Sequence, residues 1–393
     1  MNKRSIRNVD FAGKTVLVRV DFNVPTRDGV ISDDTRIRAA IPTLNLLSNG
    51  GAKVVICSHF GRPDGQIVEE MRLQPIRKRL SEILKTTVHY AGGPTGTQPA
   101  KIISQLGTGD FALLENLRFE PGEEQNDDVF SQYLASLADC FVNDAFGAAH
   151  RAHASTTGVA KHVPAYAGLL MEREITMLSR SLEGSTQATV AIIGGAKVAD
   201  KIQVLHHLSK KVDTILIGGG MVAAFYVAQN NPGGATVITE ADRLAAVDVL
   251  NAGGAKVVLP SDVITATKFS KGSTPSLRES KNVADDEIIL DIGPGSCKKY
   301  AQVISRAKRI IWNGPMGVFE WPAFANGSIA VANAVAANSK STSVVGGGST
   351  AEVIGSLNLE NQITHVSTGG GASLEFLEGK TLPGVAALDD AID

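Results

Sequence analysis

The chain has 393 residues, 43% of them hydrophobic, and 38 Lys and Arg against 40 Asp and Glu give a net charge near −2. This length predicts two domains of about 150–200 residues each, and the balanced charge argues against non-specific nucleic-acid binding, which needs a basic face. Three distant cysteines without a CxxC spacing favour a reduced intracellular protein. No signal-like apolar region follows the first residues, and no apolar run approaches the ~20 residues of a membrane span, so we expect a cytoplasmic protein.

In the N-terminal half, apolar runs typical of buried strands end in polar and basic side chains. The runs at 16–20, 54–57, 111–114 and 140–142 lead to Asp21, Asn23, His59, Arg62, Arg118 and Arg151. Arg36 begins a helical stretch, 36–47, that Ser32-Asp33-Asp34-Thr35 precedes and Gly50-Gly51 ends. The pattern therefore predicts a group of cations at corresponding strand exits and an adjacent helix start.

The chemistry of these side chains indicates their ligand. In an open α/β sheet, ligands bind outside the carboxyl ends of the strands, so the strand exits should meet. Arg binds carboxylate and phosphate as a fork, whereas Asp21 and Asn23 can accept hydrogen bonds from a ligand hydroxyl. We expect a small phosphorylated hydroxy acid with two or more negative charges, although any single Arg could equally be a surface residue.

A helical pattern at 169–182 follows this half. Leu170, Ile175 and Leu178 recur at helical spacing, and Gly184-Ser185-Thr186 predicts a break after them. We interpret the segment as a helix that joins two domains. The alternative is a surface helix inside one domain.

In the C-terminal half, strand-like apolar runs break six times into glycine. The runs at 190–193, 215–217, 288–290, 310–312, 344–345 and 366–368 precede Gly194, Gly218, Gly293, Gly314, Gly346 and Gly369. Glycine at a strand end lets the backbone approach a ligand and expose its N–H groups. We expect one edge of a parallel sheet that holds a phosphorylated ligand, a nucleotide.

Two lysines follow the first of these glycine turns. Lys197 and Lys201 are four residues apart, so a helix starting here would place both on one face, where a phosphate chain could lie between them. Two solvated lysines are the alternative. The chain contains no GxxxxGK[ST] and no strand–GxGxxG–helix fingerprint, which excludes a P-loop enzyme and weakens a dinucleotide interpretation.

Two later motifs add nucleotide chemistry. The segment 312–321 ends a strand, turns, and places Glu320 among apolar groups, which suits a base with apolar walls and a carboxylate for ribose hydroxyls. The segment 346–352 predicts a phosphate cradle in which Ser349 or Thr350 caps the next helix. A structural turn and a cap without a ligand are the respective alternatives.

Strands alternate with helical patterns throughout, which predicts an α/β protein with two doubly wound, Rossmann-like parallel-sheet domains.

Together these motifs resemble phosphoglycerate kinase along essentially the full chain. The segments that carry the resemblance are Arg19-Val-Asp-Phe-Asn-Val-Pro25, Asp33-Asp-Thr-Arg-Ile-Arg38, Ser58-His-Phe-Gly-Arg-Pro63, Leu114-Glu-Asn-Leu-Arg-Phe119, Asn143-Asp-Ala-Phe-Gly-Ala-Ala-His-Arg-Ala-His153, Gly194-Gly-Ala-Lys-Val198, Asn313-Gly-Pro-Met-Gly-Val-Phe-Glu320 and Ser367-Thr-Gly-Gly-Gly-Ala-Ser373. The resemblance implies a 3-phosphoglycerate domain at 1–168, an interdomain helix at 169–182, a nucleotide domain at 183–372, and a segment at 373–393 that returns to the first domain.

The resemblance also implies roles for particular residues. 3-Phosphoglycerate would contact Asp21, Phe22, Asn23, Arg36, His59, Phe60, Gly61, Arg62, Arg118 and Arg151. ATP or ADP, with Mg²⁺, would contact Gly195, Lys197, Lys201, Gly220, Gly293, Asn313, Pro315, Glu320, Gly346, Gly347, Gly348, Ser349 and Thr350. Arg36, Lys197 and the backbone near Gly370 would stabilise the transferring phosphoryl group. The acceptor carboxylate is already ionised at neutral pH, so no general base is needed. Domain closure would precede chemistry, and no covalent enzyme intermediate is implied.

One position departs from the family pattern. The family usually places an Asp after the triple glycine, where it binds the magnesium of the nucleotide, and this chain has Ser349. A hydroxyl can coordinate the ion or hold a bound water without supplying charge. We therefore expect activity in which the protein contributes less to Mg²⁺ binding. The alternatives are an acyl-phosphate kinase for another anionic acid and a catalytically weak nucleotide-binding protein of the same fold; the resemblance also implies a monomer.

Overall fold

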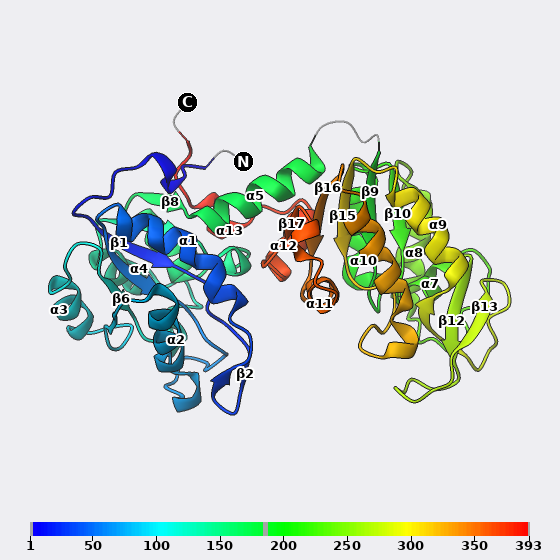
Figure 1. The fold of residues 1–393 in the computed structure, drawn as a ribbon, viewed down its shortest axis with the longest axis horizontal. Coiled ribbons are helices and arrows are strands. Elements are labelled where there is room, and N and C mark those ends of the chain that lie inside the picture. The colour runs from blue at the N-terminus through cyan, green and yellow to red at the C-terminus, as the bar shows by residue number, and fades with distance from the viewer. Residues whose placement is uncertain (1–2, 184–187, 392–393) are drawn as a thin grey trace. The chain divides into compact units, whose positions relative to one another are not determined.

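The computed structural model describes residues 3–183 and 188–391, and its contacts divide the chain into two compact units. The first comprises Met1–Thr176 with Thr381–Asp393, and the second comprises Met177–Lys380. The division falls inside helix α5 (Leu169–Leu182), drawn in green in Figure 1. The predicted break at Gly184-Ser185-Thr186 lies outside the described residues.

The first unit is built on a six-stranded parallel sheet with the order β5-β6-β4-β1-β7-β8. Its strands are β1 (Thr15–Arg19), β4 (Lys53–Cys57), β5 (Val88–Tyr90), β6 (Phe111–Leu113), β7 (Cys140–Asn143) and β8 (Ala165–Ala167). Val18 pairs with Ile56 on one side and Val142 on the other, so the polar residues after β1, β4 and β7 leave the sheet at the same edge. A two-stranded hairpin, β2 (Thr26–Arg27) with β3 (Val30–Ile31), precedes the first helix.

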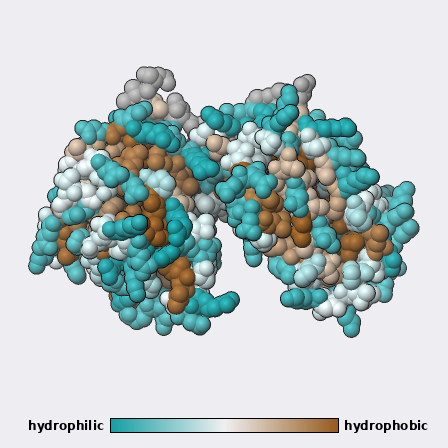
Figure 2. Space-filling model, viewed as in Figure 1, coloured by the Kyte–Doolittle hydropathy of each residue, from teal (hydrophilic) through white to brown (hydrophobic). Residues whose placement is uncertain are grey.

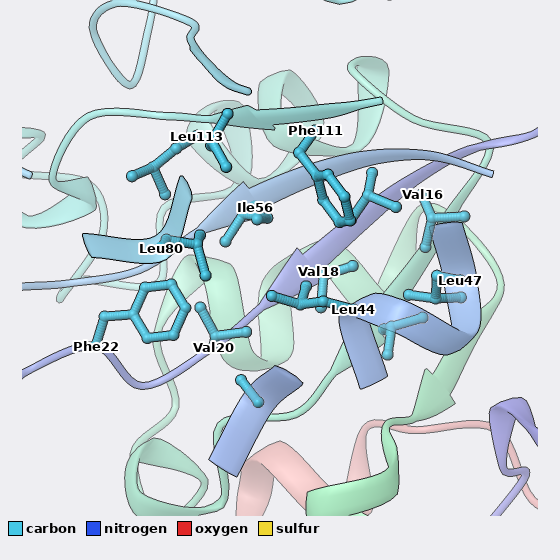
Figure 3. Close-up of a cluster of buried hydrophobic side chains, with 14 of the residues drawn as sticks. Val16, Val18, Val20, Phe22, Leu44, Leu47, Ile56, Leu80, Phe111 and Leu113 are labelled. Atoms are coloured by element: carbon cyan, nitrogen blue, oxygen red, sulfur yellow. The ribbon is translucent and has the colours of Figure 1, made fainter. Parts of the chain in front are cut away.

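Apolar side chains from the sheet and its helices form the core of this unit. The helices are α1 (Thr35–Asn49), α2 (Gln74–Leu84), α3 (Gln98–Ser104), α4 (Asp128–Ser136) and α13 (Pro383–Ala386). Val18 and Phe22 pack in one cluster with Leu44 of α1 and Leu80 of α2, all of them fully buried (Figure 3). The burial of both strand faces explains why β1 reads as a continuous apolar run rather than an alternating one.

The C-terminal segment belongs to the first unit through hydrogen bonds. Lys3 Nζ donates to Leu388 O at 2.8 Å and Asp390 Oδ1 at 2.7 Å, and the buried Asn143 Nδ2 donates to Gly384 O at 3.2 Å. Residues from opposite ends of the chain therefore complete one unit.

A buried carboxylate fixes the start of α5. Asp144 follows β7, and its Oδ1 accepts hydrogen bonds from the backbone N–H of Leu170 at 2.9 Å and Met171 at 3.2 Å. Gly168 packs so closely against Asp144 that a Cβ there would lie 2.1 Å from Oδ1. Asp144 thus supplies, from a distant point of the chain, the acceptor that a helix N-terminus needs.

The second unit has a six-stranded parallel sheet with the order β11-β10-β9-β15-β16-β17. Its strands are β9 (Thr189–Ile193), β10 (Thr214–Ile217), β11 (Lys256–Val258), β15 (Arg309–Asn313), β16 (Thr342–Gly346) and β17 (His365–Val366). The two parallel sheets confirm the predicted fold class. The prediction that all six glycine-ended runs share one edge is wrong for 288–290. β14 (Ile288–Ile292) instead pairs antiparallel with β12 (Asp262–Ala266), beside β13 (Ser276–Glu279).

Helices cover the second sheet and enclose a core around Trp312. They are α6 (Ile202–Ser209), α7 (Val222–Ala228), α8 (Glu240–Asn251), α9 (Pro294–Ile304), α10 (Asn326–Ala337), α11 (Gly348–Ser356) and α12 (Gly371–Leu377). Trp312 is fully buried, and its Nε1 donates to Gly314 O at 2.8 Å. Tyr300 donates from the core to Ile217 O at 2.6 Å, so the buried polar atoms of both aromatic residues have partners.

Hydrophilic side chains cover much of the visible surface of each unit, with smaller hydrophobic areas between them (Figure 2). Within the described residues, no helix is long and apolar enough to cross a membrane.

Candidate active site

The first group of candidate residues surrounds the exit of β1. Arg36 Nη1 donates to Asp21 Oδ2 at 3.0 Å and to Asn23 O at 3.1 Å, and the amide oxygen of Asn23 accepts from Gly61 N at 3.0 Å. Asp21, Asn23 and Arg36 are only partly buried. The structure therefore brings the exits of β1 and β4 and the start of α1 together, as the sequence pattern predicts.

Arg118 lies close to the same loops. Its Nη1 donates to Gly61 O at 2.7 Å, and its Nε lies 3.1 Å from Glu124 Oε1. The short helix η3 (Leu117–Phe119), which carries Arg118, is held by Asn116, whose Oδ1 accepts from both Arg118 N and Phe60 N at 3.1 Å. A buried asparagine that the sequence did not single out thus fixes the position of Arg118.

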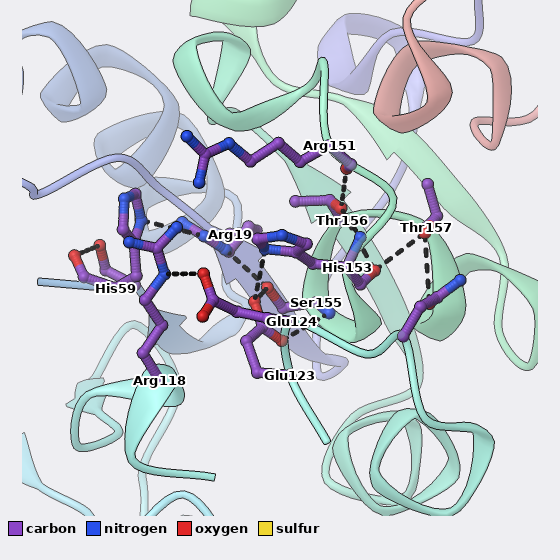
Figure 4. A network of polar contacts seen from close by, with 12 residues as sticks. Arg19, His59, Arg118, Glu123, Glu124, Arg151, His153, Ser155, Thr156 and Thr157 are labelled. Carbon is purple, nitrogen blue, oxygen red and sulfur yellow. Dashed lines mark hydrogen bonds and ion pairs between the residues drawn. The ribbon is translucent and has the colours of Figure 1, made fainter. Parts of the chain in front are cut away.

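Arg151 and Arg62 complete the cationic group. Arg151 is partly buried, and its Nε donates to His150 Nε2 at 3.2 Å, whereas Arg62 is exposed. Figure 4 shows Arg118, Arg151 and His59 around one network. Phe22 and Phe60 are buried, so their side chains belong to the core, and only their backbone could face a ligand.

Beneath these residues lies a buried ionic network that sequence reasoning missed. Arg19 is 1% exposed; its Nε donates to Ser155 Oγ at 2.8 Å, and its Nη2 lies 3.1 Å from His59 Nδ1. Ser155 in turn donates to the buried Glu123, by its hydroxyl at 2.5 Å and its backbone N–H at 3.0 Å (Figure 4). The only sequence signal was an arginine inside the apolar run 16–20.

Burial among cations keeps His59 and His153 neutral. Burial, and then the charges of Arg19 and Arg118, lower the pKa of His153 to about 4. The pKa of His59 lies well below its ordinary value for the same reasons, burial first. A neutral His59 whose Nδ1 accepts from Arg19 carries its proton on Nε2. The positive charge of the site therefore comes from arginine.

The second group lies at the carboxyl edge of the second sheet. Lys201 Nζ donates to Gly194 O at 2.7 Å, to Asn313 Oδ1 at 2.7 Å and to Asn313 O at 3.1 Å. Burial lowers the pKa of Lys201 to about 8. Lys201 thus joins the ends of β9 and β15, where it is surrounded by carbonyl oxygens.

Lys197 occupies a different environment. It is exposed and precedes the short helix η7 (Ala199–Lys201), and the α-helix α6 starts only at Ile202. The prediction that Lys197 and Lys201 share one α-helical face is therefore wrong. The glycines in front of them explain the difference, because Gly195 adopts φ 134° and turns the chain before any helix can begin.

The glycine loop after β16 also differs in detail from its prediction. Gly347, with φ 90°, is the N-cap of α11, and no side chain caps this helix. Thr350 is buried, and its Oγ1 accepts from Gly314 N at 2.7 Å, so it joins two strand exits instead of capping α11. Ser349 is exposed at the first turn of α11. A Cβ on Gly348 would meet no atom within 4 Å, so the space beside this exposed glycine is open.

Other glycines serve close packing rather than ligand approach. A Cβ on Gly194 would lie 1.9 Å from Pro315 O, one on Gly219 would lie 2.5 Å from Gly195 O, and one on Gly293 would lie 2.4 Å from the Asp262 carboxyl. A Cβ on Gly220 would lie 3.1 Å from Ala196 O. By contrast Gly370, with φ 51°, faces open space in front of α12. A glycine at a strand end can therefore reflect either close packing or the approach of a ligand, and the sequence alone does not distinguish the two.

The residues at this edge suit a nucleotide better than a metal ion alone. Glu320 is exposed and Pro315 partly buried on the turn after β15, while Asn313 is committed to Lys201. Among the described residues, no group of three or more His, Cys, Asp or Glu could hold a metal. Ser349 offers one hydroxyl at the exposed first turn of α11. This donor set fits a magnesium ion only if phosphates and water supply most of its ligands.

Two α/β units, one with a cluster of cations at its sheet edge and the other with a glycine-lined edge, define a phosphotransferase of the two-domain α/β class. The sequence profile named Phosphoglycerate kinase matches residues 6–380, and the chain belongs to this family. Members of this family use a magnesium nucleotide.

Individual relatives agree with this assignment. Phosphoglycerate kinase of Herpetosiphon aurantiacus is 49% identical over 395 residues, covering 99% of this chain and 100% of the relative. That of Dictyoglomus turgidum is 48% identical, covering 98% of both chains. The solved phosphoglycerate kinase structures from Coxiella burnetii and Pyrococcus horikoshii are 38% and 33% identical, with TM-scores of 0.88 and 0.83 and 98% coverage of each chain.

Proposed function

We propose that this chain transfers a phosphoryl group reversibly between 1,3-bisphosphoglycerate and ADP, giving 3-phosphoglycerate and ATP. The observation that carries the proposal is the convergence of Arg36, Arg118, Arg151 and neutral His59 on one sheet edge in a chain of this family. Such a cluster suits a ligand with several negative charges.

In the proposed complex, 3-phosphoglycerate binds at the first unit. Arg118 and Arg151 bind its phosphate, Arg62 reaches the same ligand from the surface, and the Asp21 and Asn23 side chains accept from its hydroxyl. His59 donates from Nε2. Arg36 faces the carboxylate from the start of α1, where its Nη1 is held by Asp21 and Asn23 O.

The nucleotide binds at the second unit. Its phosphates meet the backbone N–H groups of Gly346, Gly347 and Gly348, with Lys197 and Lys201 as cations, and Glu320 accepts from the ribose hydroxyls. Lys201 then exchanges some of its carbonyl partners for phosphate oxygen. The backbone of Gly195, Gly220, Gly293 and Pro315 shapes the pocket edge, and Thr350 holds the loop through Gly314.

The chemistry needs positioning and charge, not proton transfer. In the ATP-forming direction, a β-phosphate oxygen of ADP attacks the acyl phosphorus, a new P–O bond forms, and the carboxylate leaves with the electron pair of the broken bond. A carboxylate with a pKa of about 4 is a stable leaving group at neutral pH. Lys197, Arg36 and the N–H groups near Gly370 stabilise the charge on the three equatorial oxygens.

A magnesium ion bound to the nucleotide would add charge neutralisation between the phosphates. Ser349 is the residue that would face it, by its hydroxyl or through a water. Because the two substrates bind to different units, we propose that the units approach each other about α5 before transfer and exclude water. We further propose that the protein acts as a cytoplasmic monomer.

A catalytically weak nucleotide-binding protein is the second candidate, and Ser349 is the observation that favours it. Calorimetric titration with each substrate separates the two. Arg118→Ala should abolish binding of 3-phosphoglycerate and leave ADP binding intact, whereas Lys201→Ala should do the reverse. A protein that binds only nucleotide, with no response to 3-phosphoglycerate in the wild type, would favour the second candidate.

A further inference from the structure

A carboxylate on α8 contacts the turn that carries Lys197. Asp242 is 3% exposed, and its Oδ1 accepts a hydrogen bond from Ala199 N at 3.0 Å. Its Oδ2 is fixed by Thr239, whose hydroxyl donates at 2.6 Å and whose backbone N–H donates at 3.2 Å. The Asp242 backbone N–H donates back to the Thr239 hydroxyl at 3.1 Å, which closes a capping box at the start of α8.

Ala199 is the first residue of η7 and lies two positions after Lys197. The first N–H groups of a helix lack a partner within the helix, so Asp242 satisfies an amide that the turn cannot satisfy itself. Val198, between the two, is fully buried. On the other side, Gly195 O accepts from Met221 N at 3.1 Å. The backbone that carries the exposed Lys197 is therefore held at both ends.

The charge of Asp242 also acts at Lys197. Burial alone would raise the pKa of Asp242, but hydrogen bonds from Thr239 and Ala199, followed by the charge of Lys197, hold that pKa below its ordinary value. Asp242 is thus ionised at neutral pH, and the charge of Lys197 acts on it. The carboxylate combines a directional contact to the backbone with an attraction for the lysine ammonium.

We propose that Asp242 is a positioning residue for phosphoryl transfer, which sets the location of Lys197 through the amide of Ala199. The inference rests on the proposed function, since it needs Lys197 to act on the transferring group. Asp242 touches neither substrate. It fixes the backbone of Lys197, whose flexible side chain must place its ammonium group at the transferring phosphoryl group. Misplacement of such a group by about 1 Å can lower the rate on the order of 100-fold.

Three variants separate positioning from simple capping of α8. Asp242→Ala removes the acceptor and the charge, and Asp242→Asn keeps an acceptor oxygen without the charge. Thr239→Ala removes the capping hydroxyl of α8 and its hydrogen bond to Asp242 Oδ2, but it leaves the backbone N–H of residue 239 on Oδ2 and the Ala199 N–H on Oδ1. Each is assayed for kcat and for the KM of both substrates, for thermal stability, and for hydrogen exchange at the Ala199 amide.

The proposal predicts that Asp242→Ala lowers kcat by roughly 10-fold to 100-fold while both KM values stay near wild type, because Lys197 acts in the transition state. Exchange at Ala199 should quicken. Asp242→Asn should lose only about fivefold or less in kcat, because it keeps an acceptor for Ala199 N and removes only the attraction for the exposed Lys197. Thr239→Ala should lower the Tm as Asp242→Ala does, with kcat and Ala199 protection near wild type.

Equal losses of kcat in Thr239→Ala and Asp242→Ala would overturn the proposal and leave Asp242 as a cap. Wild-type kcat in Asp242→Ala, with fast exchange at Ala199, would also overturn it. These results differ from a failure of the proposed function, which would appear as no turnover in the wild type. If Asp242→Ala does not fold, kcat and hydrogen exchange at the Ala199 amide are measured in Asp242→Asn instead. A 100-fold lower kcat in that variant, with exchange at Ala199 as slow as in the wild type, would contradict the positioning role.

Discussion

Arg19 and His59 meet inside the first unit, with Arg19 Nη2 3.1 Å from His59 Nδ1 and both side chains buried. The contact joins the end of β1 to the loop after β4. It also fixes the tautomer of a histidine that we assign to 3-phosphoglycerate. An inner arginine therefore positions the neutral histidine of the proposed substrate site.

Replacing Arg19 tests this relationship. Arg19→Met should destabilise the protein by about 3–5 kcal/mol, because it removes the largest compensating charge from the buried Glu123 carboxylate. Urea unfolding measures the loss. The double variant Arg19→Met with Glu123→Gln should recover part of it, and two additive losses would contradict the proposed coupling.

The pH dependence of stability tests the buried carboxylate at α5. Burial raises the pKa of Asp144 to about 6. A carboxyl whose folded pKa is raised contributes stability that is complete below its unfolded pKa, near 4, and lost as pH rises through 6.

Asp144→Asn removes this titration. Relative to the variant, the wild type should therefore lose up to about 3 kcal/mol of unfolding free energy between pH 4 and pH 6 and change little above pH 7. Urea unfolding across this range measures the difference. A constant difference between the two proteins over the whole range would show that Asp144 does not titrate there.

The role of Lys197 is tested by separating rate from affinity. Lys197→Ala should lower kcat by about 100-fold to 1,000-fold, because it removes a cation from the developing charge, with little change in ADP affinity. Steady-state kinetics measures kcat, and calorimetric titration measures the affinity for ADP. Equal losses in both would mean that Lys197 only binds nucleotide.

The serine at the magnesium position gives a gain-of-function prediction. Ser349→Asp should lower the Mg²⁺ concentration needed for half-maximal activity and tighten ADP binding in the presence of Mg²⁺, since a carboxylate adds charge to the ligand set. Ser305→Asp, at an exposed serine elsewhere in the second unit, serves as the control. An unchanged Mg²⁺ titration would show that Ser349 is not the metal position.

The sequence predicted the elements better than it predicted their contacts. Apolar runs and strand-end polar residues indicated two parallel sheets with ligand edges, because burial and chain direction are local properties of the pattern. The pairing of β14 was mispredicted, since a glycine-ended run does not reveal which strand lies beside it.

Prediction of the candidate site residues from the sequence was limited in the same way. The cations of the first unit were identifiable because each follows a strand or, for Arg36, lies at the start of a helix. Asn116, Glu123 and Ser155 were not, since they act through buried hydrogen bonds to residues distant in the chain. Ser349 or Thr350 was expected to cap α11 from its position in the sequence, but no side chain caps this helix, and the Thr350 hydroxyl accepts from Gly314 N. Three-dimensional proximity, not residue type, decides these roles.

ATP-dependent phosphorylation of 3-phosphoglycerate in a coupled assay, titrated with Mg²⁺, tests the central claim most directly. We predict robust turnover in the wild type that requires both substrates and is lost in Arg118→Ala and Lys197→Ala. An absence of turnover at every Mg²⁺ concentration, by a protein that still binds ATP, would contradict the proposed function.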